Sequence, residues 1–199
     1  DLLRANLIAE SYIPPKDIRK LRESTRERKI FVRQTTQIKN RIHAIVIARG
    51  IALPRSTLCK FTIKWLKEKC CETDVLKDYL DILEYYEKKL QEINKKISVI
   101  AEDNKNAQLL MTIPGIASIR ALDIAAEIGE IKRFQTADKL CSYAGLVPSI
   151  RQSGTVLHFG RLIKQSSKNL KYVLIETSWS ITKMKERNHL NEFYHKLSK

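Results

Sequence analysis

A heptad pattern of apolar residues between positions 76 and 100 constrains the fold of this chain most strongly. Its eight members follow one another at intervals of three and four residues: Leu76, Tyr79, Leu83, Tyr86, Leu90, Ile93, Ile97 and Ile100. This spacing places all eight on one stripe of an α-helix, and Glu and Lys residues surround the stripe. The pattern therefore predicts one continuous helix over residues 76–100. Because a single helix cannot bury such a stripe alone, the helix needs a partner.

A second long helical segment is expected over residues 15–49, where Gly50 is a plausible C-terminal stop and Pro54 a break. Its apolar positions at helical spacing are Phe31, Ile38, Ile42 and Ile45. A shorter apolar and basic helix is expected over residues 56–69. The stripe of residues 76–100 could pack on the 15–49 helix in an antiparallel hairpin or on another subunit in a coiled coil, and the pattern favours neither.

The charge of the chain is strongly basic and unevenly distributed. Lys and Arg number 37 against 22 acidic residues, which gives a formal net charge of +15. Residues 1–56 hold 13 basic and 5 acidic side chains, residues 57–105 hold 10 of each, and residues 106–199 hold 14 and 7. Two basic segments thus flank a neutral one. A polyanion such as nucleic acid is the natural partner, because neutralised phosphates release condensed counterions; the alternative is a solvated surface that keeps the protein soluble.

Several classes of protein are disfavoured by composition. No apolar run reaches the roughly 18 residues of a membrane-spanning helix, and the N-terminus lacks the pattern of a signal peptide, so we expect a cytoplasmic protein without a membrane partner. The cysteines are Cys59, Cys70, Cys71 and Cys141. They show no CxxC spacing, which argues against a structural metal site and for reduced, intracellular thiols.

The composition changes near residue 104, after which Gly, Ser and Ala become more frequent. We therefore predict two domains: a basic helical linker and coiled coil over residues 1–104, and a compact helical domain over residues 105–199. The fold class is expected to be mainly α.

Residues 110–122, read as LMTIPGIASIRAL, resemble a helix-hairpin-helix motif. In that motif an apolar-Pro-Gly-apolar turn presents backbone N–H groups at the start of a second helix, which suits a DNA phosphate. Gly115 would allow close approach of the backbone. Ala117 stands where a second glycine is usual. The alternative is a helix–turn–helix corner that packs only within the protein.

A Ser-Gly pair lies in the alternating, glycine-containing stretch of residues 149–160, which indicates a loop or a short hairpin. Ser153 beside Arg151, Arg161 and Lys164 could be a nucleophile in a phosphate-binding setting. Taken by itself this signal favours a plain turn, where Ser-Gly is common.

An ordered series of motifs resembles one family over residues 106–180. The series consists of Thr112-Ile-Pro-Gly-Ile, Ala125-Ala-Glu-Ile-Gly129, Phe134, Lys139-Leu140, Ala144-Gly-Leu-Val-Pro148, Ser153-Gly154, Gly160, Lys164 and Leu170. It is similar to the DEDD transposases of insertion sequences, which include Piv-type DNA invertases and bridge-RNA-guided recombinases. Residues 1–50 resemble the family more loosely. The chain has Ser166 where the family often has the glycine of Lys-x-Gly.

The resemblance implies that different domains carry the metal ions and the nucleophile. An N-terminal RuvC-like domain would hold magnesium with four acidic residues, a helical linker would follow, and a C-terminal domain would supply a serine nucleophile. Carried onto this chain, the nucleophile is Ser153. The residues expected to contact nucleic acid are Gly115, Arg151, Gly154, Arg161, Lys164 and Lys168. No magnesium is expected in this chain, since the family's last acidic pair would fall just before Asp1.

The sequence is therefore expected to be a fragment of a DNA transposase or recombinase that binds DNA and is inactive alone. In some relatives an RNA guides target choice, and the basic residues 1–56 suit RNA or DNA. A homo-oligomer through the coiled coil is expected. The alternatives are a non-enzymatic helix-hairpin-helix DNA-binding protein derived from a transposase, and a coiled-coil scaffold whose charge is incidental.

Overall fold

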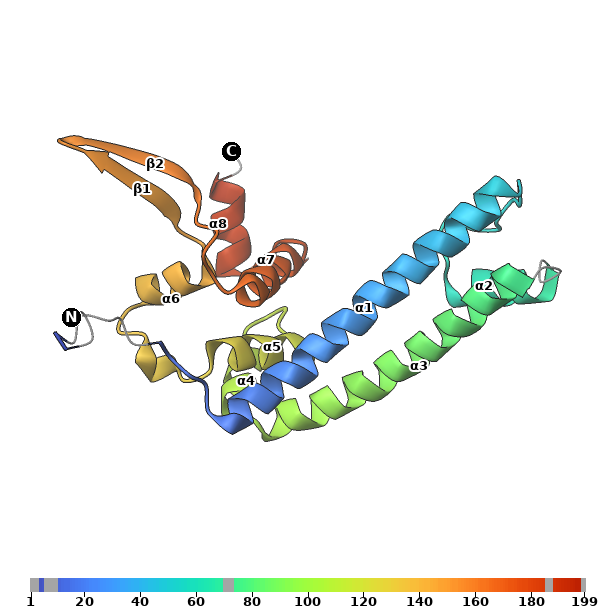
Figure 1. Cartoon of the computed structure of the whole chain (residues 1–199), viewed down its shortest axis with the longest axis horizontal. Helices are drawn as coiled ribbons and strands as arrows, with labels where there is room; N and C mark the ends of the chain where they lie inside the picture. The colour runs from blue at the N-terminus through green and yellow to red at the C-terminus, as the bar shows by residue number, and fades with distance from the viewer. Residues whose placement is uncertain (1–3, 6–10, 70–73, 185–187, 198–199) are drawn as a thin grey trace. The chain divides into compact units, whose positions relative to one another are not determined.

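Helices dominate the computed structural model, which describes residues 4–5, 11–69, 74–184 and 188–197 (Figure 1). The elements are α1 (Lys16–Ala48), α2 (Lys60–Lys69), α3 (Asp74–Asp103), α4 (Lys105–Met111), α5 (Ser118–Ile128), the 3-10 turn η1 (Ile131–Arg133), α6 (Ala137–Ala144), β1 (Pro148–Ser153), β2 (Val156–Leu162), α7 (Lys168–Thr182) and α8 (His189–Leu197). The expected mainly α class is confirmed. Within the described ranges, no helix has the length and apolar character to cross a bilayer.

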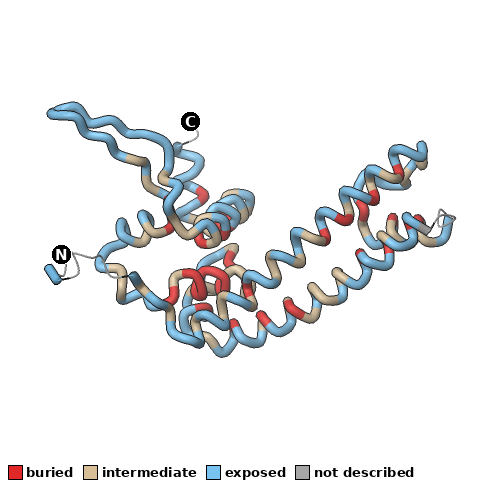
Figure 2. Tube along the Cα trace, viewed as in Figure 1, coloured by how far each residue is buried: buried red, intermediate tan, exposed pale blue. Residues whose placement is uncertain are grey.

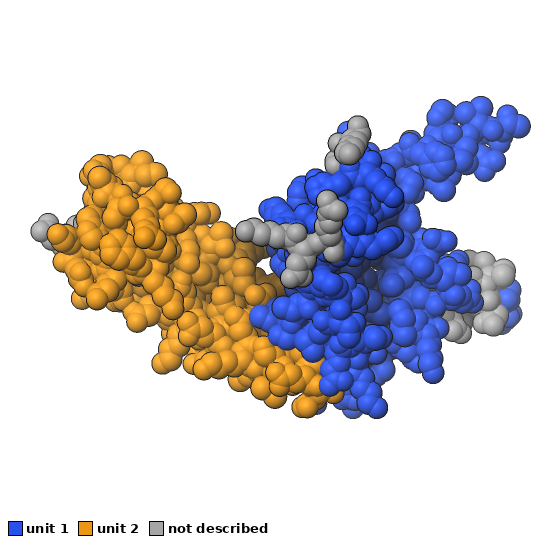
Figure 3. All heavy atoms as spheres, turned by 180° about the vertical axis from the view of Figure 1, so that it is seen from behind, with its two compact units in different colours: residues 1–23, 104–199 blue, residues 24–103 orange. Residues whose placement is uncertain are grey.

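The chain forms two compact units, which Figure 3 colours separately. Unit 2 comprises residues 24–103, and unit 1 comprises residues 1–23 together with 104–199. The end of unit 2 falls where the composition changes. Residues 11–23, however, pack with the C-terminal part of the chain and not with the rest of the segment 1–104. The division into domains at residue 104 concerns independent folding and stays a prediction.

In unit 2, helices α1 and α3 run antiparallel. Arg28 Nε donates to Asn94 Oδ1 at 2.7 Å, and Lys39 Nζ lies 2.8 Å from Glu87 Oε1. Because the later residue of α1 meets the earlier residue of α3, the two helices point in opposite directions. Of the two partners that the heptad stripe allowed, the structure therefore shows the one within the chain. An oligomer formed through these helices stays a prediction.

The expected continuous helix over residues 76–100 is confirmed, because α3 contains the whole span. Its stripe contributes to an apolar core that is shared with α1 and α2. The buried members of this core are Ile38, Ile42, Val46, Leu58, Leu66, Leu76, Leu80 and Leu83. The expected 15–49 helix is also confirmed as α1. The prediction that the short helix begins near Ser56 is wrong, since α2 begins at Lys60 and buried Leu58 enters the core from the preceding loop.

Helix α5 forms the centre of unit 1. Residues 121–127 are all buried, and Figure 2 shows α5 as the most continuous buried stretch of this unit. A helix covered on all sides must be apolar or have its polar groups paired. Accordingly, the Glu127 carboxylate accepts a hydrogen bond from Ser167 Oγ at 3.4 Å. The core of unit 1 is thus built around α5, on which α4 and α7 pack.

Two arginines attach residues 11–23 to unit 1. Arg22 donates from Nε to the carbonyl oxygen of Ala126 and from a terminal nitrogen to that of Glu127, each at 2.8 Å. These carbonyls end α5, where a cation also meets the negative end of the helix dipole. The Arg133 guanidinium lies 4.2 Å from the centroid of the Tyr12 ring, a cation–π contact. The N-terminal segment therefore belongs structurally to the C-terminal region.

Candidate active-site hairpin

Strands β1 and β2 form a hairpin whose turn carries Ser153. The strands are antiparallel, and Ser153 lies opposite Val156. Gly154 and Thr155 form the two-residue turn between them, and Gly154 has a φ of +60°. Tight hairpin turns need this left-handed conformation, which glycine adopts without steric cost. Of the loop and the short hairpin expected from the sequence, the structure shows the hairpin.

Cross-strand pairing sorts the side chains of the hairpin onto two faces. Ser153 pairs with Val156 and Arg151 pairs with His158. Alternate residues of a strand point to the same side, so these four side chains share one face. The opposite face consists of the pairs Gln152 with Leu157, Ile150 with Phe159, and Pro148 with Leu162. Ser153 therefore has a guanidinium and an imidazole on its own face, and a largely apolar face behind it.

The hairpin is open to solvent along its length. Every residue of β2 is exposed, and β1 is exposed at all positions except the half-buried Ser149. Within the described part of the chain, the Ser153 hydroxyl has no hydrogen-bond partner. A large substrate such as a DNA strand could therefore reach this hydroxyl without displacing another side chain.

A β-bulge separates Arg161 from the turn. Gly160 and Arg161 oppose the single residue Ser149, where the register of the pairing shifts. A Cβ atom on Gly160 would collide with the hydroxyl oxygen of Ser149, so glycine lets the strands approach at this point. Five residues of extended strand place Arg161 about 17 Å from Val156 beside the turn. The structure therefore puts Arg151, and not Arg161, next to Ser153.

The two lysines expected at the site lie beyond the base of the hairpin. Lys164 follows β2, and Lys168 is the first residue of α7; both are exposed. Ser167 caps α7 by accepting a hydrogen bond from the Leu170 N–H at 3.4 Å. The structure thus does not gather the predicted basic residues around Ser153.

The base of the hairpin is fixed by the loop that precedes it. The Ile163 N–H donates to the Val147 carbonyl at 3.1 Å. Gly145 ends α6 with a φ of +73°, and a Cβ atom there would lie 2.5 Å from the Ser166 Cβ. Ser166, which replaces the frequent glycine of the family, therefore packs against a glycine in this chain. The close packing of Ser166 on Gly145 and the Ile163–Val147 hydrogen bond thus fix the base of the hairpin.

The helix-hairpin-helix-like corner lies between α4 and α5. Gly115 has a φ of +87°, and a Cβ atom there would lie 2.9 Å from Ile181 Cγ1 of α7. The close approach that Gly115 permits is therefore to the protein's own helix. Ala117 is the N-cap residue of α5, and its side chain makes no capping hydrogen bond. Contact of Gly115 with DNA stays a prediction.

No magnesium site is apparent in the described ranges, where no group of three or more His, Cys, Asp and Glu side chains could hold a metal ion. The donor set that magnesium prefers, several carboxylate oxygens around one point, is therefore not assembled by these residues. The described residues therefore do not fit the metal that the resemblance implies for the family.

Cys59 is the thiol with the most perturbed environment among the described cysteines. Its sulfur lies 3.3 Å from Thr62 Oγ1 at the start of α2. The side-chain hydrogen bond between Cys59 and Thr62, together with the backbone amide of Thr62, lowers the pKa of the Cys59 thiol to about 7. Cys141 is free and exposed, whereas Cys70 and Cys71 lie outside the described residues.

Sequence reasoning missed two features that the structure brings out. His158 shares the face of Ser153, which follows once Gly154 and Thr155 are assigned as the turn, because Arg151 must then oppose His158. Helix α7 presents an exposed row that contains Tyr172 and Trp179. The sequence does carry a signal for this row. Large apolar residues recur at intervals of three and four residues on the side of α7 opposite its buried positions.

Residues 107–195 match the family model described as Transposase IS116/IS110/IS902 family. The transposase for insertion sequence element IS1328 of Yersinia enterocolitica is 27% identical over 155 residues, which is 76% of this chain and 46% of that protein. The putative transposase y4qE of Sinorhizobium fredii is 25% identical over 187 residues, 90% of this chain and 45% of that protein.

The pilin gene-inverting protein of Moraxella bovis is 44% identical over 71 residues, 36% of this chain and 20% of that protein. The chain therefore spans about half the length of the first two relatives and less of the third. The matched region coincides with the ordered motifs of residues 106–180, so the resemblance read from them is confirmed. Residues 107–195 of the chain are thus similar to the transposases of the IS116/IS110/IS902 family.

Proposed function

We propose that this chain supplies the serine nucleophile of a DNA transposase or recombinase. The observation that carries the proposal is the position of Ser153 in the family-matched region, on an exposed hairpin turn with Arg151 on the same face. The names of the relatives, which are transposases and a pilin gene-inverting protein, support DNA as the substrate. The net charge of +15 suits the same partner.

The proposed step is an exchange at one DNA phosphodiester. Ser153 Oγ attacks phosphorus, the bond from phosphorus to one deoxyribose oxygen breaks, and a serine–DNA phosphodiester forms. The hydroxyl proton leaves serine, and the departing deoxyribose oxygen gains a proton. Arg151 can neutralise the phosphate oxygens during this exchange, because a guanidinium donates two parallel hydrogen bonds to such oxygens.

We propose that His158 is the general base that accepts the proton of the Ser153 hydroxyl. Its partner across the hairpin is Arg151, so it is the diagonal neighbour of Ser153 on the same face. Diagonal neighbours lie about 7–8 Å apart at the backbone, a span that an imidazole can bridge directly or through one water molecule. Imidazole is the common side-chain proton acceptor near neutral pH. Attack would make His158 an imidazolium, which could return the proton to the departing oxygen.

The resemblance implies that magnesium is held by an acidic RuvC-like domain, and we propose that this chain works together with such a domain. We therefore expect this chain alone to bind DNA without cutting it. An RNA guide and an oligomer formed through α1 and α3 are further parts of the proposal, and the basic residues of α1 would serve either nucleic acid.

A second candidate function is DNA binding without chemistry. It is favoured by the Pro-Gly turn before α5, because the N-terminus of a helix presents backbone N–H groups that can hold a phosphate, and the N-cap residue Ala117 has no polar side chain. The first proposal requires the Ser153 hydroxyl for covalent bond formation, whereas DNA binding without chemistry does not require it.

The two candidates separate in an assay that combines this chain with the acidic domain of the family and a labelled DNA substrate. Ser153→Ala should abolish the covalent protein–DNA adduct and leave DNA binding within about twofold. Thr155→Ala, in the same turn, is the matched control and should keep the adduct. Adduct formation by Ser153→Ala would refute the nucleophile and leave the non-enzymatic reading.

A further inference from the structure

Helix α7 carries a solvent-exposed row of large side chains. Tyr172, Ile175 and Trp179 follow one another at intervals of three and four residues and are 58%, 40% and 54% exposed. The opposite side of α7 is buried through Leu170, Val173, Thr177 and Ile181. The row is therefore not the part of α7 that supports the fold. Large apolar side chains that are exposed side by side in this way mark a candidate interaction surface.

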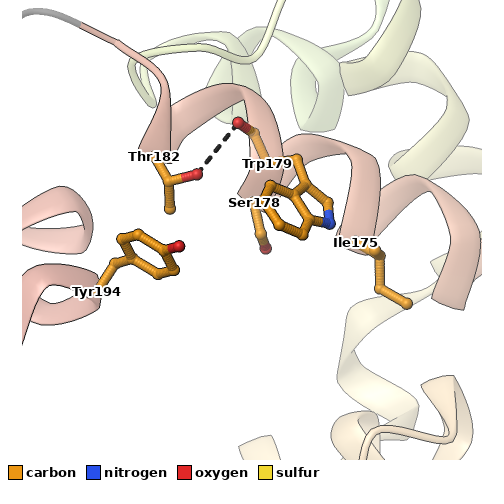
Figure 4. A pocket seen from close by; sticks show the side chains of 5 residues that line it. All are labelled: Ile175, Ser178, Trp179, Thr182 and Tyr194. Atoms are coloured by element: carbon orange, nitrogen blue, oxygen red, sulfur yellow. Dashed lines mark hydrogen bonds between the residues drawn. The ribbon is translucent and has the colours of Figure 1, made fainter. Parts of the chain in front are cut away.

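Helix α8 completes a small cavity beside the row. Ile175, Ser178, Trp179, Thr182 and Tyr194 line a cavity of about 160 Å³. Figure 4 shows Tyr194 of α8 across from Trp179 and Thr182 of α7. Buried Asn191 of α8 donates to the carbonyl oxygens of Thr182 at 3.4 Å and Met184 at 3.0 Å, which holds the two helices together. We call Tyr172, Ile175, Trp179, Thr182 and Tyr194 the α7–α8 surface.

Lysines stand at both ends of the α7–α8 surface. Lys168 lies one turn before Tyr172 in the same row, and Lys183 lies one turn after Trp179 with its Nζ 5.7 Å from the Trp179 ring centroid. The rise of an α-helix separates the two lysines by about 22 Å, the length of several nucleotides. Glu176 is the acidic residue of α7 and borders the row.

These features fit unpaired nucleobases better than they fit a protein. Lysine is depleted in protein–protein interfaces relative to the rest of the protein surface. Single-stranded nucleic acid, in contrast, is bound by aromatic side chains that stack on bases and by cations that follow the phosphates. In a duplex the faces of the bases are covered by stacking, so exposed rings have little to bind.

We propose that the α7–α8 surface binds unpaired bases of single-stranded DNA, with Trp179 and Tyr194 contacting the bases and Lys168 and Lys183 contacting phosphates. The choice of DNA over RNA rests on the proposed function, because breaking a DNA strand leaves an end whose bases can unpair. The site is separate from Ser153 and needs no chemistry there.

The test uses the fluorescence of Trp179 in the whole chain with Trp65→Phe, which removes the other tryptophan. A 15-residue oligo-dT should quench this fluorescence strongly, and a duplex of the same length should quench it much less. Trp179→Ala should weaken oligo-dT binding, measured with a labelled strand, by about 5- to 150-fold, the loss of one stacked base. Trp179→Phe should retain most of the affinity, because a phenyl ring can still stack.

Leu109→Ala, at an exposed apolar position on α4, is the matched control and should leave oligo-dT affinity unchanged. Lys183→Gln should reduce the slope of log affinity against log salt concentration by about 1, the contribution of one phosphate contact. Ser153→Ala should not alter quenching, so the failure of the nucleophile assignment would leave this result intact. The proposal is overturned if oligo-dT does not quench Trp179 or if Trp179→Ala binds oligo-dT normally. It is also overturned if only RNA quenches, or if Trp179→Ala changes self-association in sedimentation while DNA binding persists.

Discussion

Truncation of Leu83 to alanine should destabilise unit 2 strongly. Leu83 is 0% exposed and belongs to the core shared by α1, α2 and α3. Removing three carbon atoms loses their transfer free energy and leaves a cavity, which for buried Leu→Ala costs about 2–5 kcal/mol. We expect about 3 kcal/mol, because the neighbouring side chains sit on helices from both sides and cannot collapse fully into the gap. This corresponds to about a 160-fold change in the unfolding equilibrium.

Urea unfolding measures this change when it is followed by the fluorescence of Trp65, which packs against the same core, in a Trp179→Phe background. The matched control is Ile82→Ala, one residue earlier on α3 and 42% exposed, which should cost less than about 1 kcal/mol. Equal effects of the two substitutions would refute the assignment of the heptad stripe to the interior of this chain. A loss that depends on protein concentration would instead place the stripe in an interface between copies.

Three further predictions concern other parts of the molecule. Gly145→Ala should lower the melting temperature more than Gly154→Ala: both glycines have left-handed φ values, but a Cβ atom at Gly145 overlaps Ser166 and one at Gly154 meets open space. Equal shifts would contradict this. Iodoacetamide should alkylate Cys59 with a half-maximal rate near pH 7, rising with pH as the thiolate forms, whereas Cys141 serves as the internal reference; a Cys59 midpoint at or above about 8.5 would contradict it. Affinity for duplex DNA should fall steeply with salt, with a log–log slope of about −3 or steeper, and a flat dependence would exclude an electrostatic interface.

The helices of unit 2 were predictable because their signal is local. Apolar residues at intervals of three and four define α1 and α3 without reference to the rest of the chain. The partner of the stripe was not predictable, since both an intrachain and an intermolecular helix satisfy the same pattern. The start of α2 was missed because burial of Leu58 in the loop is a tertiary effect.

The position of residues 11–23 shows the same limit of local signals. Their basic composition grouped them with the linker, yet Arg22 binds the carbonyl oxygens that end α5, more than one hundred residues away in sequence. No spacing rule links an arginine to a distant helix terminus. The contact depends on where both helices lie after folding.

The candidate site was predictable in part. Ser153, Gly154 and Arg151 are close in sequence and remain close because a tight turn joins them. Arg161 and Lys168 are also near in sequence, but extended strands carry residues apart at about 3.4 Å each, so they lie far from the turn. The sequence indicated that something approaches Gly115 closely but not whether it is DNA or another part of the protein. In the structure, Ile181 of α7 approaches it.

The most direct test of the account is to locate the DNA phosphate on the protein. The chain is combined with the acidic domain of the family and a cleavable DNA substrate, the adduct is digested with protease and nuclease, and the modified residue is identified by mass spectrometry. We predict a single phosphodiester-derived mass on Ser153, with none on the nearby hydroxyls of Ser149 and Thr155. A phosphate on either of those residues, or on a residue of the acidic domain, would contradict the assignment of Ser153 as the nucleophile.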